Sequence, residues 1–198
     1  MKNNVLIALG VVIGVILLIA LAFGGVYNRL VAADESVKSS WAQVENVYQR
    51  RLDLIPNLVE MVKGYAAHER GTLQGVVEAR AKISQMNISS DIVNDPNALA
   101  KFQALQGQLS SALSRLLVVA EQYPDLKASQ NFLALQTQLE GTENRIAVER
   151  NRFNEAARHF NTMRRTFPSI FIANALGFKE KAYFQAETGA ARAPAVTF

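Results

Sequence analysis

Apolar residues recur at alternating steps of three and four over a long stretch near the start of the chain. The members of this stripe are Leu30, Val37, Trp41, Val44, Tyr48, Ile55, Val59, Val62 and Ala66. This spacing puts them on one face of an α-helix and does not fit the alternation of a strand. Two charged residues, Asp34 and Arg51, occupy positions of the same stripe. The pattern therefore predicts one long helix with an apolar face turned to a core.

Residues 5–26 precede the stripe and contain no charged or polar side chain. As a helix, this run would be about 33 Å long, which is enough to cross the hydrocarbon core of a membrane. Lys2 and the A-L-A sequence at 20–22 also fit a cleaved signal peptide. The run exceeds the usual apolar part of a signal peptide and leads directly into the stripe, which favours an uncleaved anchor. We expect anchor and first long helix to be continuous.

A proline lies inside the predicted helix, in the segment RRLDLIPNLVEMVKGYAAHE at residues 50–69. Pro56 removes one backbone hydrogen bond and clashes with the preceding turn at Leu52. The stripe nevertheless stays in register on both sides, through Ile55 and Val59. A helix that is packed on both sides of a proline can bend and continue. We therefore predict a kink at Pro56 rather than a helix end.

The same rhythm marks three more helices, and no segment has the pattern of a strand. The predicted elements are a short helix over 73–86, a loop over 87–96, a second short helix over 99–119 and a long helix over 132–167. Asp95 and Pro96 are a typical N-cap and first helical residue. Short connections favour antiparallel neighbours. The predicted fold class is all-α, an N-terminal transmembrane helix followed by an antiparallel four-helix bundle whose first and fourth helices are long.

Charged residues on the two long helices match across this predicted pair. With Tyr27 level with Phe167, the antiparallel register pairs Arg51 with Glu143, Glu45 with Arg150, and Trp41 with Phe153. Opposite charges that meet between helices fix their register and orientation. We predict such a register-setting network from Glu45, Arg50, Arg51, Asp53, Glu140, Glu143, Arg145 and Arg150. A binding pocket beneath the Pro56 kink is the alternative interpretation.

The segment FPSIFIANALGF at 167–178 follows the last long helix, which Pro168 ends. Antiparallel packing brings it to the membrane end, where two helices offer little surface to cover its large side chains. We expect contact with the bilayer interface or a neighbouring subunit from Phe167, Ile170, Phe171, Ile172, Leu176 and Phe178. Packing under its own chain is the alternative. Lys179 and Lys181, which follow, are placed to meet lipid phosphates.

The elements divide the chain into five predicted parts. These are a short tail at 1–4, a transmembrane helix at 5–26, a bundle at 27–166, a membrane-proximal return segment at 167–184 and a disordered tail at 185–198. Gly10 and Gly14 form a G-x-x-x-G pair that would let two anchors pack closely, although glycine is common in membrane helices in any case.

Composition removes several classes of function. The chain has no cysteine, which excludes a disulfide framework, a cysteine-based zinc site and a thiol nucleophile. A net charge of +4 is too mild and dispersed for a nucleic-acid-binding surface. The two histidines, His68 and His159, belong to opposite ends of the predicted bundle, and no catalytic or nucleotide-binding motif is present. We predict no catalytic residues, no metal and no cofactor.

Four segments together resemble the LemA family of bacterial membrane proteins. They are YNRLV after the anchor, RRLDLIPNLVEMVKGYAAHE, YPDLKASQNFLALQTQLEGTENRIAVERNRFN and FPSIFIANALGF. The resemblance covers about residues 27–184, and the order of its long motifs makes it specific. It implies an N-terminal membrane anchor and an antiparallel helical bundle, and it implies no established catalytic activity.

Two hypotheses for function follow. The first is a structural or scaffolding protein of the bacterial envelope that forms homo-oligomers and contacts the lipid bilayer. The second is an adaptor that docks another membrane protein, such as an envelope protease, or regulates it. In either case we expect a single-pass protein of the bacterial inner membrane with its N-terminus inside and its bundle on the extracytoplasmic side. The positive charges flanking the anchor, Lys2 before it and Arg29 after it, are nearly balanced and give little support to that orientation.

Overall fold

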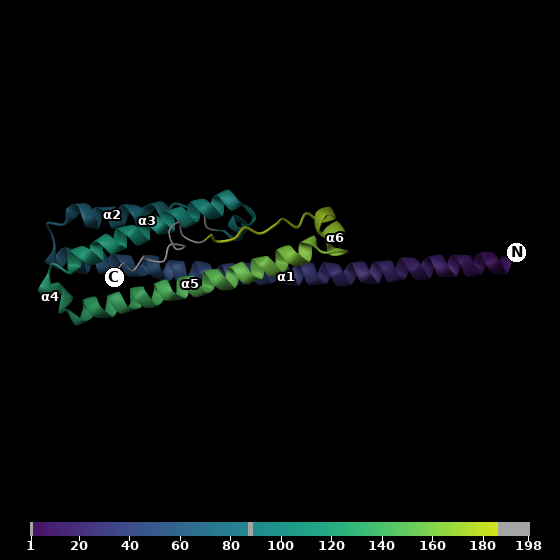
Figure 1. The fold of residues 1–198 in the computed structure, drawn as a ribbon, viewed down its shortest axis with the longest axis horizontal. Helices are drawn as coiled ribbons and strands as arrows, with labels where there is room; N and C mark the ends of the chain where they lie inside the picture. Colours follow the sequence, from purple (N-terminus) through teal and green to yellow (C-terminus); the bar gives the residue numbers. More distant parts are fainter. Residues whose placement is uncertain (1, 87–88, 186–198) are drawn as a thin grey trace, which may run out of the picture.

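The computed structural model describes residues 2–86 and 89–185, and it is all-α, with no strand among those residues. Its helices are α1 Lys2–Tyr65, α2 Arg70–Ser84, the 3-10 helix η1 Ser90–Asn94, α3 Pro96–Ala120, α4 Pro124–Lys127, α5 Gln130–Arg165 and α6 Ser169–Ala175. They form an elongated molecule in which α5 returns alongside α1 and the pair α2 and α3 thickens the end far from the N-terminus (Figure 1). We call that end distal, and the end toward the N-terminus proximal.

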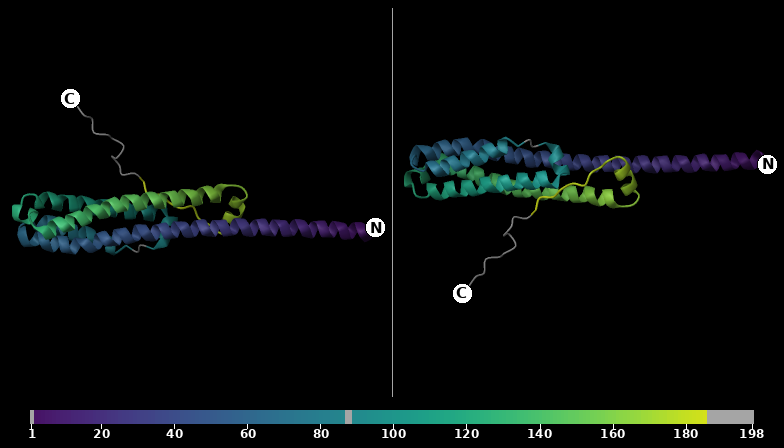
Figure 2. Two further views of the ribbon diagram at one scale, coloured as in Figure 1. Left: turned by 90° about the horizontal axis from the view of Figure 1, so that it is seen from below. Right: turned by 90° about the horizontal axis from the view of Figure 1, so that it is seen from above.

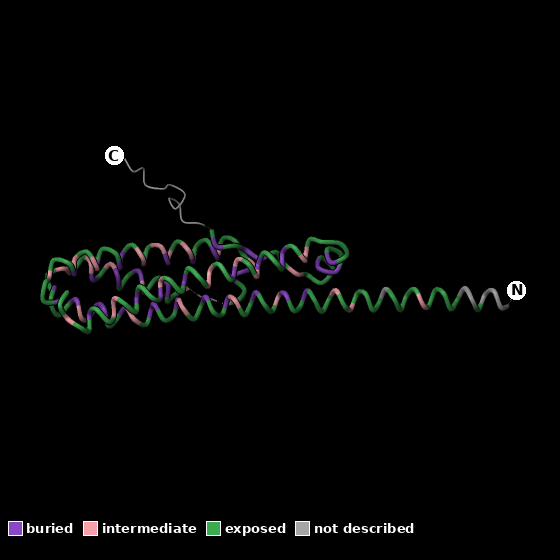
Figure 3. The backbone as a smooth tube through the Cα atoms, turned by 60° about the horizontal axis from the view of Figure 1, so that its bottom comes forward, coloured by how far each residue is buried: buried purple, intermediate pink, exposed green. Residues whose placement is uncertain are grey.

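The first helix is 64 residues long and includes both the apolar run and the stripe. The predicted continuity of anchor and bundle is therefore confirmed. The N-terminal part of α1 projects alone beyond the other helices in both views of Figure 2. The most apolar stretch of this part has a mean hydropathy of 2.8, and none of its residues is buried in the protein, as Figure 3 shows by colour. By length and composition it is able to cross a membrane.

Pro56 lies inside α1, which continues through it as predicted. Because Pro56 has no backbone N–H, the carbonyl of Leu52 one turn earlier loses its helical donor. Arg80 of α2 supplies a replacement, donating from Nε to the Leu52 carbonyl at 3.1 Å. The neighbouring helix thus satisfies the group that the proline leaves unpaired. The direction and angle of a kink stay a prediction.

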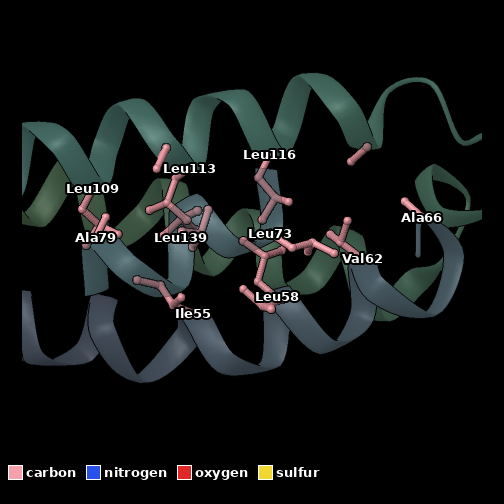
Figure 4. Close-up of a cluster of buried hydrophobic side chains, with 14 of the residues drawn as sticks. Ile55, Leu58, Val62, Ala66, Leu73, Ala79, Leu109, Leu113, Leu116 and Leu139 are labelled. Atoms are coloured by element: carbon pink, nitrogen blue, oxygen red, sulfur yellow. The ribbon is translucent and has the colours of Figure 1, made fainter. Parts of the chain in front are cut away.

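The distal core lies among α1, α2, α3, α4 and α5 and is almost wholly aliphatic (Figure 4). Its fully buried members include Ile55, Val62, Val76, Leu109 and Leu116. The three-four stripes of the sequence supply these residues, so each helix buries the face that its pattern predicts. The predicted N-cap is also present, because the side chain of Asp95 accepts a hydrogen bond from the backbone N–H of Asn97 at 2.9 Å.

The proximal core combines aromatic and aliphatic side chains and contains a segment that the sequence does not predict. Residues 178–185, which we call the strap, leave α6 and run back along the bundle toward its distal end (Figures 1 and 2). Within the strap, Lys181, Ala182 and Phe184 are buried. The predicted membrane-proximal return segment, 167–184, therefore ends in a strap whose residues Lys181, Ala182 and Phe184 are buried in the bundle. Gln185, assigned to the disordered tail, belongs to the strap, and the rest of that predicted tail, 186–198, lies outside the described residues.

Candidate functional site: a buried strap and an exposed collar

Arg51 and Glu143 face each other in the distal half, as predicted. Arg51 is 1% exposed, and its Nη1 lies 2.5 Å from Oε1 of Glu143, which is itself partly exposed. Its guanidinium also donates to the Ser110 hydroxyl at 3.0 Å and to the Gln106 side-chain oxygen at 2.5 Å. We call these four residues the distal network. It joins α1, α3 and α5, so a buried cation in the stripe is matched by acceptors from two other helices.

The other predicted members of the charge network lie elsewhere. Glu45, Arg50, Asp53, Glu140 and Arg145 are all exposed. Gln49 donates to Asp53 at 2.8 Å and Gln136 donates to Glu140 at 3.0 Å, each within one helix. Arg150 donates to the carbonyl of Gln185 at 3.0 Å. The pairing of Glu45 with Arg150 stays a prediction. The register itself is right, with the rings of Trp41 and Phe153 5.6 Å apart.

Three side-chain amides bind the backbone of the strap, each pairing with both the N–H and the carbonyl of one residue. Asn161 donates to the Lys181 carbonyl at 2.8 Å and accepts from its N–H at 2.8 Å. Asn154 makes the same pair with Phe184 at 3.0 and 2.9 Å, and Gln103 makes it with Gln185 at 2.7 and 3.2 Å. The backbone of the strap needs these partners because the described part of the chain holds no neighbouring strand to supply them.

Lys181 anchors the strap by its side chain. Its Nζ lies 2.6 Å from Oδ1 of Asp34 and 2.8 Å from Oδ1 of Asn94, and 4.9 Å from the centre of the Phe160 ring. We call Lys181, Asp34 and Asn94 the clasp. Lys181 is 5% exposed, so the expectation that it meets lipid phosphates is wrong. Burial acts to raise the pKa of the Asp34 carboxyl, but hydrogen bonds and charge from Lys181 and Lys38 hold that pKa below its ordinary value.

Phe184 fills an aromatic pocket in the proximal core. Its ring stacks on Trp41 with centroids 6.0 Å apart and meets the edge of Phe153 at 5.6 Å. The guanidinium of Arg150 lies 4.9 Å from the centre of the same ring. Burial of an aromatic ring with such neighbours is among the strongest contributions to a core. The strap is thus held at two side-chain anchors, residues 181 and 184, in addition to its backbone.

The helix α6 has two faces. Ile172 and Ala173 are buried against Leu30, and Phe178 packs beside them, its ring 6.4 Å from that of Tyr27. For Ile172 and Phe178 the expected membrane or subunit contact is wrong, because they pack under their own chain. Ile170 and Phe171 of α6 are 37 and 67% exposed, and the residues that flank the helix, Phe167 and Leu176, are 82 and 50% exposed. We call these four residues the collar. It lies where the apolar part of α1 ends.

Gly10 and Gly14 lie on the exposed apolar part of α1, and a Cβ added at either would meet nothing within 4 Å. Their faces are therefore open to a partner helix or to lipid, and their role in packing anchors stays a prediction.

These features define a class of protein. One exposed apolar helix, long enough to cross a membrane, continues without interruption into an all-α bundle closed by a C-terminal strap. The model of the LemA family matches residues 40–198, so the chain belongs to the LemA family, in agreement with the resemblance of its sequence motifs. Family and fold together describe a membrane-associated helical protein.

Two kinds of relative were found by sequence. The chain is 28% identical over 187 residues to magnetosome protein MamQ of Magnetospirillum gryphiswaldense, covering 86% of this chain and 68% of that protein. It is 26% identical over 159 residues to protein LemA of Metamycoplasma hominis, covering 80% of this chain and 68% of that protein. Both similarities extend over most of the bundle.

Proposed function

We propose that this protein is a membrane-anchored scaffold of the bacterial envelope whose copies associate at the membrane surface, and that it is not an enzyme. The observation that carries the proposal is the collar. Four large apolar side chains, two on α6 and two directly flanking it, are exposed next to the end of the apolar part of α1. An apolar patch of this kind favours burial in the bilayer interface or against another subunit.

The position of the collar supports contact at the membrane surface. Because α6 packs on Leu30, it lies just beyond residues 5–26, at the level where a spanning helix leaves the hydrocarbon. Phe23 and Tyr27 of α1 are exposed at the same level, 47 and 41%. Aromatic side chains are enriched at this depth of a bilayer. Anchor and collar would hold neighbouring copies in the same plane, in the inner membrane, with the bundle on the extracytoplasmic side.

The test measures the mass of full-length protein in nanodiscs or mild detergent. We expect a discrete oligomer for the natural chain, and dissociation when Phe167→Ser and Phe171→Ser are combined. The matched control combines Val118→Ser and Leu133→Ser, two exposed apolar residues of the bundle, 64 and 48%, and should leave the mass unchanged. A natural chain that is monomeric, and that binds another membrane protein instead, would favour the adaptor hypothesis and overturn this proposal.

A further inference from the structure

The groove that holds the strap recognises an extended peptide mainly through its backbone. Asn161, Asn154 and Gln103 each bind the N–H and the carbonyl of one strap residue, and the Val93 carbonyl accepts from the Ala182 N–H at 2.8 Å. Every peptide presents these groups, whatever chain it belongs to. Paired contacts of this kind are those by which proteins bind an added extended segment, with side-chain pockets giving specificity.

Two pockets supply that specificity. The first is polar and acidic, formed by Asp34 and Asn94 and occupied by the Lys181 ammonium. The second is aromatic, formed by Trp41 and Phe153 and occupied by Phe184. Between them Ala182 is buried, at 7% exposed, whereas Tyr183 is 41% exposed and its hydroxyl accepts a hydrogen bond from Asn161 at 2.8 Å. The groove therefore selects a Lys-Ala-x-Phe sequence in an extended conformation.

None of these contacts requires the strap to come from the same chain. The strap follows α5 through residues 166–177, which attach to α1 and α5 by the cluster of Leu30, Ile172 and Ala173 and by the bonds of Arg164 to Asn174 and the Phe178 carbonyl. A second copy carries an identical strap. Anchoring in one membrane brings copies to a high effective concentration, and exchange of identical elements forms oligomers without any new type of contact.

We propose that the groove is a peptide-binding site for the Lys-Ala-x-Phe segment of a second copy of this chain, so that exchange of straps links neighbouring copies. The proposal rests on the proposed oligomeric function, since exchange needs copies that meet. It goes further by assigning the donor segment, the receiving groove and the residues that recognise each other.

The absence of native cysteine allows a direct test. Two differently tagged full-length copies are co-expressed, one with Val93→Cys and the other with Ala182→Cys. The two positions are joined by the backbone hydrogen bond described above, so a strap that lies in the groove brings the backbones of these two residues together. We expect a disulfide-linked pair of unlike copies, which forms only when one strap lies in the other copy's groove.

Two controls give the result its meaning. One chain carrying both substitutions reports how much strap stays in its own groove, by an internal disulfide. A copy with Gln108→Cys, exposed on α3, co-expressed with the Ala182→Cys copy, reports random collision. We expect the Val93→Cys pair to exceed this background by about tenfold or more, because a bound strap holds two thiols together. Internal disulfide with unlike pairs only at background would overturn the proposal.

A second measurement does not depend on disulfide geometry. Asp34→Lys breaks the pocket of one copy, and Lys181→Asp breaks the strap of another. Expressed alone, each variant places like charges together and should lose oligomer. Co-expressed, each groove meets a complementary strap only from the other copy, so unlike pairs should return. If the natural chain is oligomeric and neither rescue nor cross-linking occurs, strap exchange is wrong and the scaffold proposal stands. A monomeric natural chain would overturn both.

Discussion

The distal and proximal halves of this bundle bury a cation each, and they do so in different ways. In the distal half, Arg51 projects from a helix and is bound by side chains of two other helices, beside an aliphatic core. In the proximal half, Lys181 projects from an extended strap and is bound by Asp34 of α1 and Asn94, beside an aromatic core. The two positions of α1 that interrupt its apolar stripe, Asp34 and Arg51, are the α1 contributions to these sites.

The difference shows what an extended segment needs in order to replace a helix in a core. A helix satisfies its own backbone and presents only side chains to its neighbours. The strap has no such internal bonds, so its neighbours must supply donors and acceptors. Asn154 and Asn161 on α5 and Gln103 on α3 do this. The proximal half therefore depends on specific amides and anchors, while the distal half depends on the shape of apolar faces.

The largest expected effect comes from emptying the aromatic pocket of the strap. Phe184→Ala should lower the free energy of unfolding by about 3–5 kcal/mol, because it removes a buried ring and leaves a cavity. Chemical denaturation measures the loss, and hydrogen exchange should show it concentrated in the proximal half. The control, Leu133→Ala, removes a side chain that is 48% exposed on the bundle and should change stability by less than about 0.5 kcal/mol. An equal loss of protection in both halves would contradict the proposed division.

Next comes the distal network. Glu143→Arg or Arg51→Glu alone should cost about 3 kcal/mol, the lower end for breaking a buried pair, because Glu143 is partly exposed to water. The double reversal should recover part of this loss. A thermodynamic cycle on urea unfolding measures the coupling. A coupling energy of zero would show that the two residues contribute independently and do not set the register.

The clasp should give a smaller effect that depends on pH. Asp34→Asn should cost about 2 kcal/mol at neutral pH, since it removes a charge-assisted bond from a buried ammonium. The folded-state pKa of Asp34 lies below its ordinary value of 3.8. Its contribution is therefore complete above that value and is lost as the pH falls through the lower folded pKa. Natural and variant stabilities measured from pH 7 to pH 2 should converge.

A matched pair of lysines sharpens this result. Both Lys181 and Lys38 contact Asp34, but Lys181 is buried and Lys38 is exposed. Lys181→Met should weaken the proximal half, whereas Lys38→Met should change stability by less than about 0.5 kcal/mol, as for other surface pairs. If both variants lose the same stability in denaturation experiments, the burial of Lys181 in the strap does not strengthen its pairing with Asp34.

The smallest effect concerns the helix proline. Arg80→Met should cost about 1 kcal/mol, because the Leu52 carbonyl loses the donor that replaces its helical partner. In a chain that also carries Pro56→Ala, the restored backbone N–H supplies that donor, and the cost of Arg80→Met should disappear. Four unfolding curves complete this test. A cost that persists without the proline would mean that Arg80 contributes in another way.

Periodicity predicted the helices because each one buries a face, and a buried face leaves a regular trace in the sequence. It also placed Arg51 opposite Glu143 and Trp41 beside Phe153, since antiparallel helices of known length have few possible registers. The interrupted stripe marked Asp34 and Arg51 as unusual. The helical fold and one of the two buried cations, Arg51, were therefore predictable from the sequence.

The strap was not predictable in the same way. The three amides that bind the strap look like ordinary surface positions of a helix; they are Asn154, Asn161 and Gln103. Their partners are backbone atoms, which are the same in every residue and leave no mark in the amino-acid sequence. Lys181 looked like a lipid-binding residue because its apolar neighbours suggested a membrane surface. Only the spacing of Ala182 and Phe184, small and large residues two apart, carries the trace of an extended buried segment. That trace is too short to be distinguished from chance.

Because α1 is one continuous helix, the bundle is a direct extension of the predicted membrane anchor. From Tyr27 to Tyr65 the helix is about 58 Å long, so a tilt of about 20° in its spanning part would carry the distal tip sideways by about 20 Å. A change in lipid thickness alters the tilt of a spanning helix. If α1 spans the bilayer as we propose, the same tilt would move the whole bundle and would change the position of its distal tip.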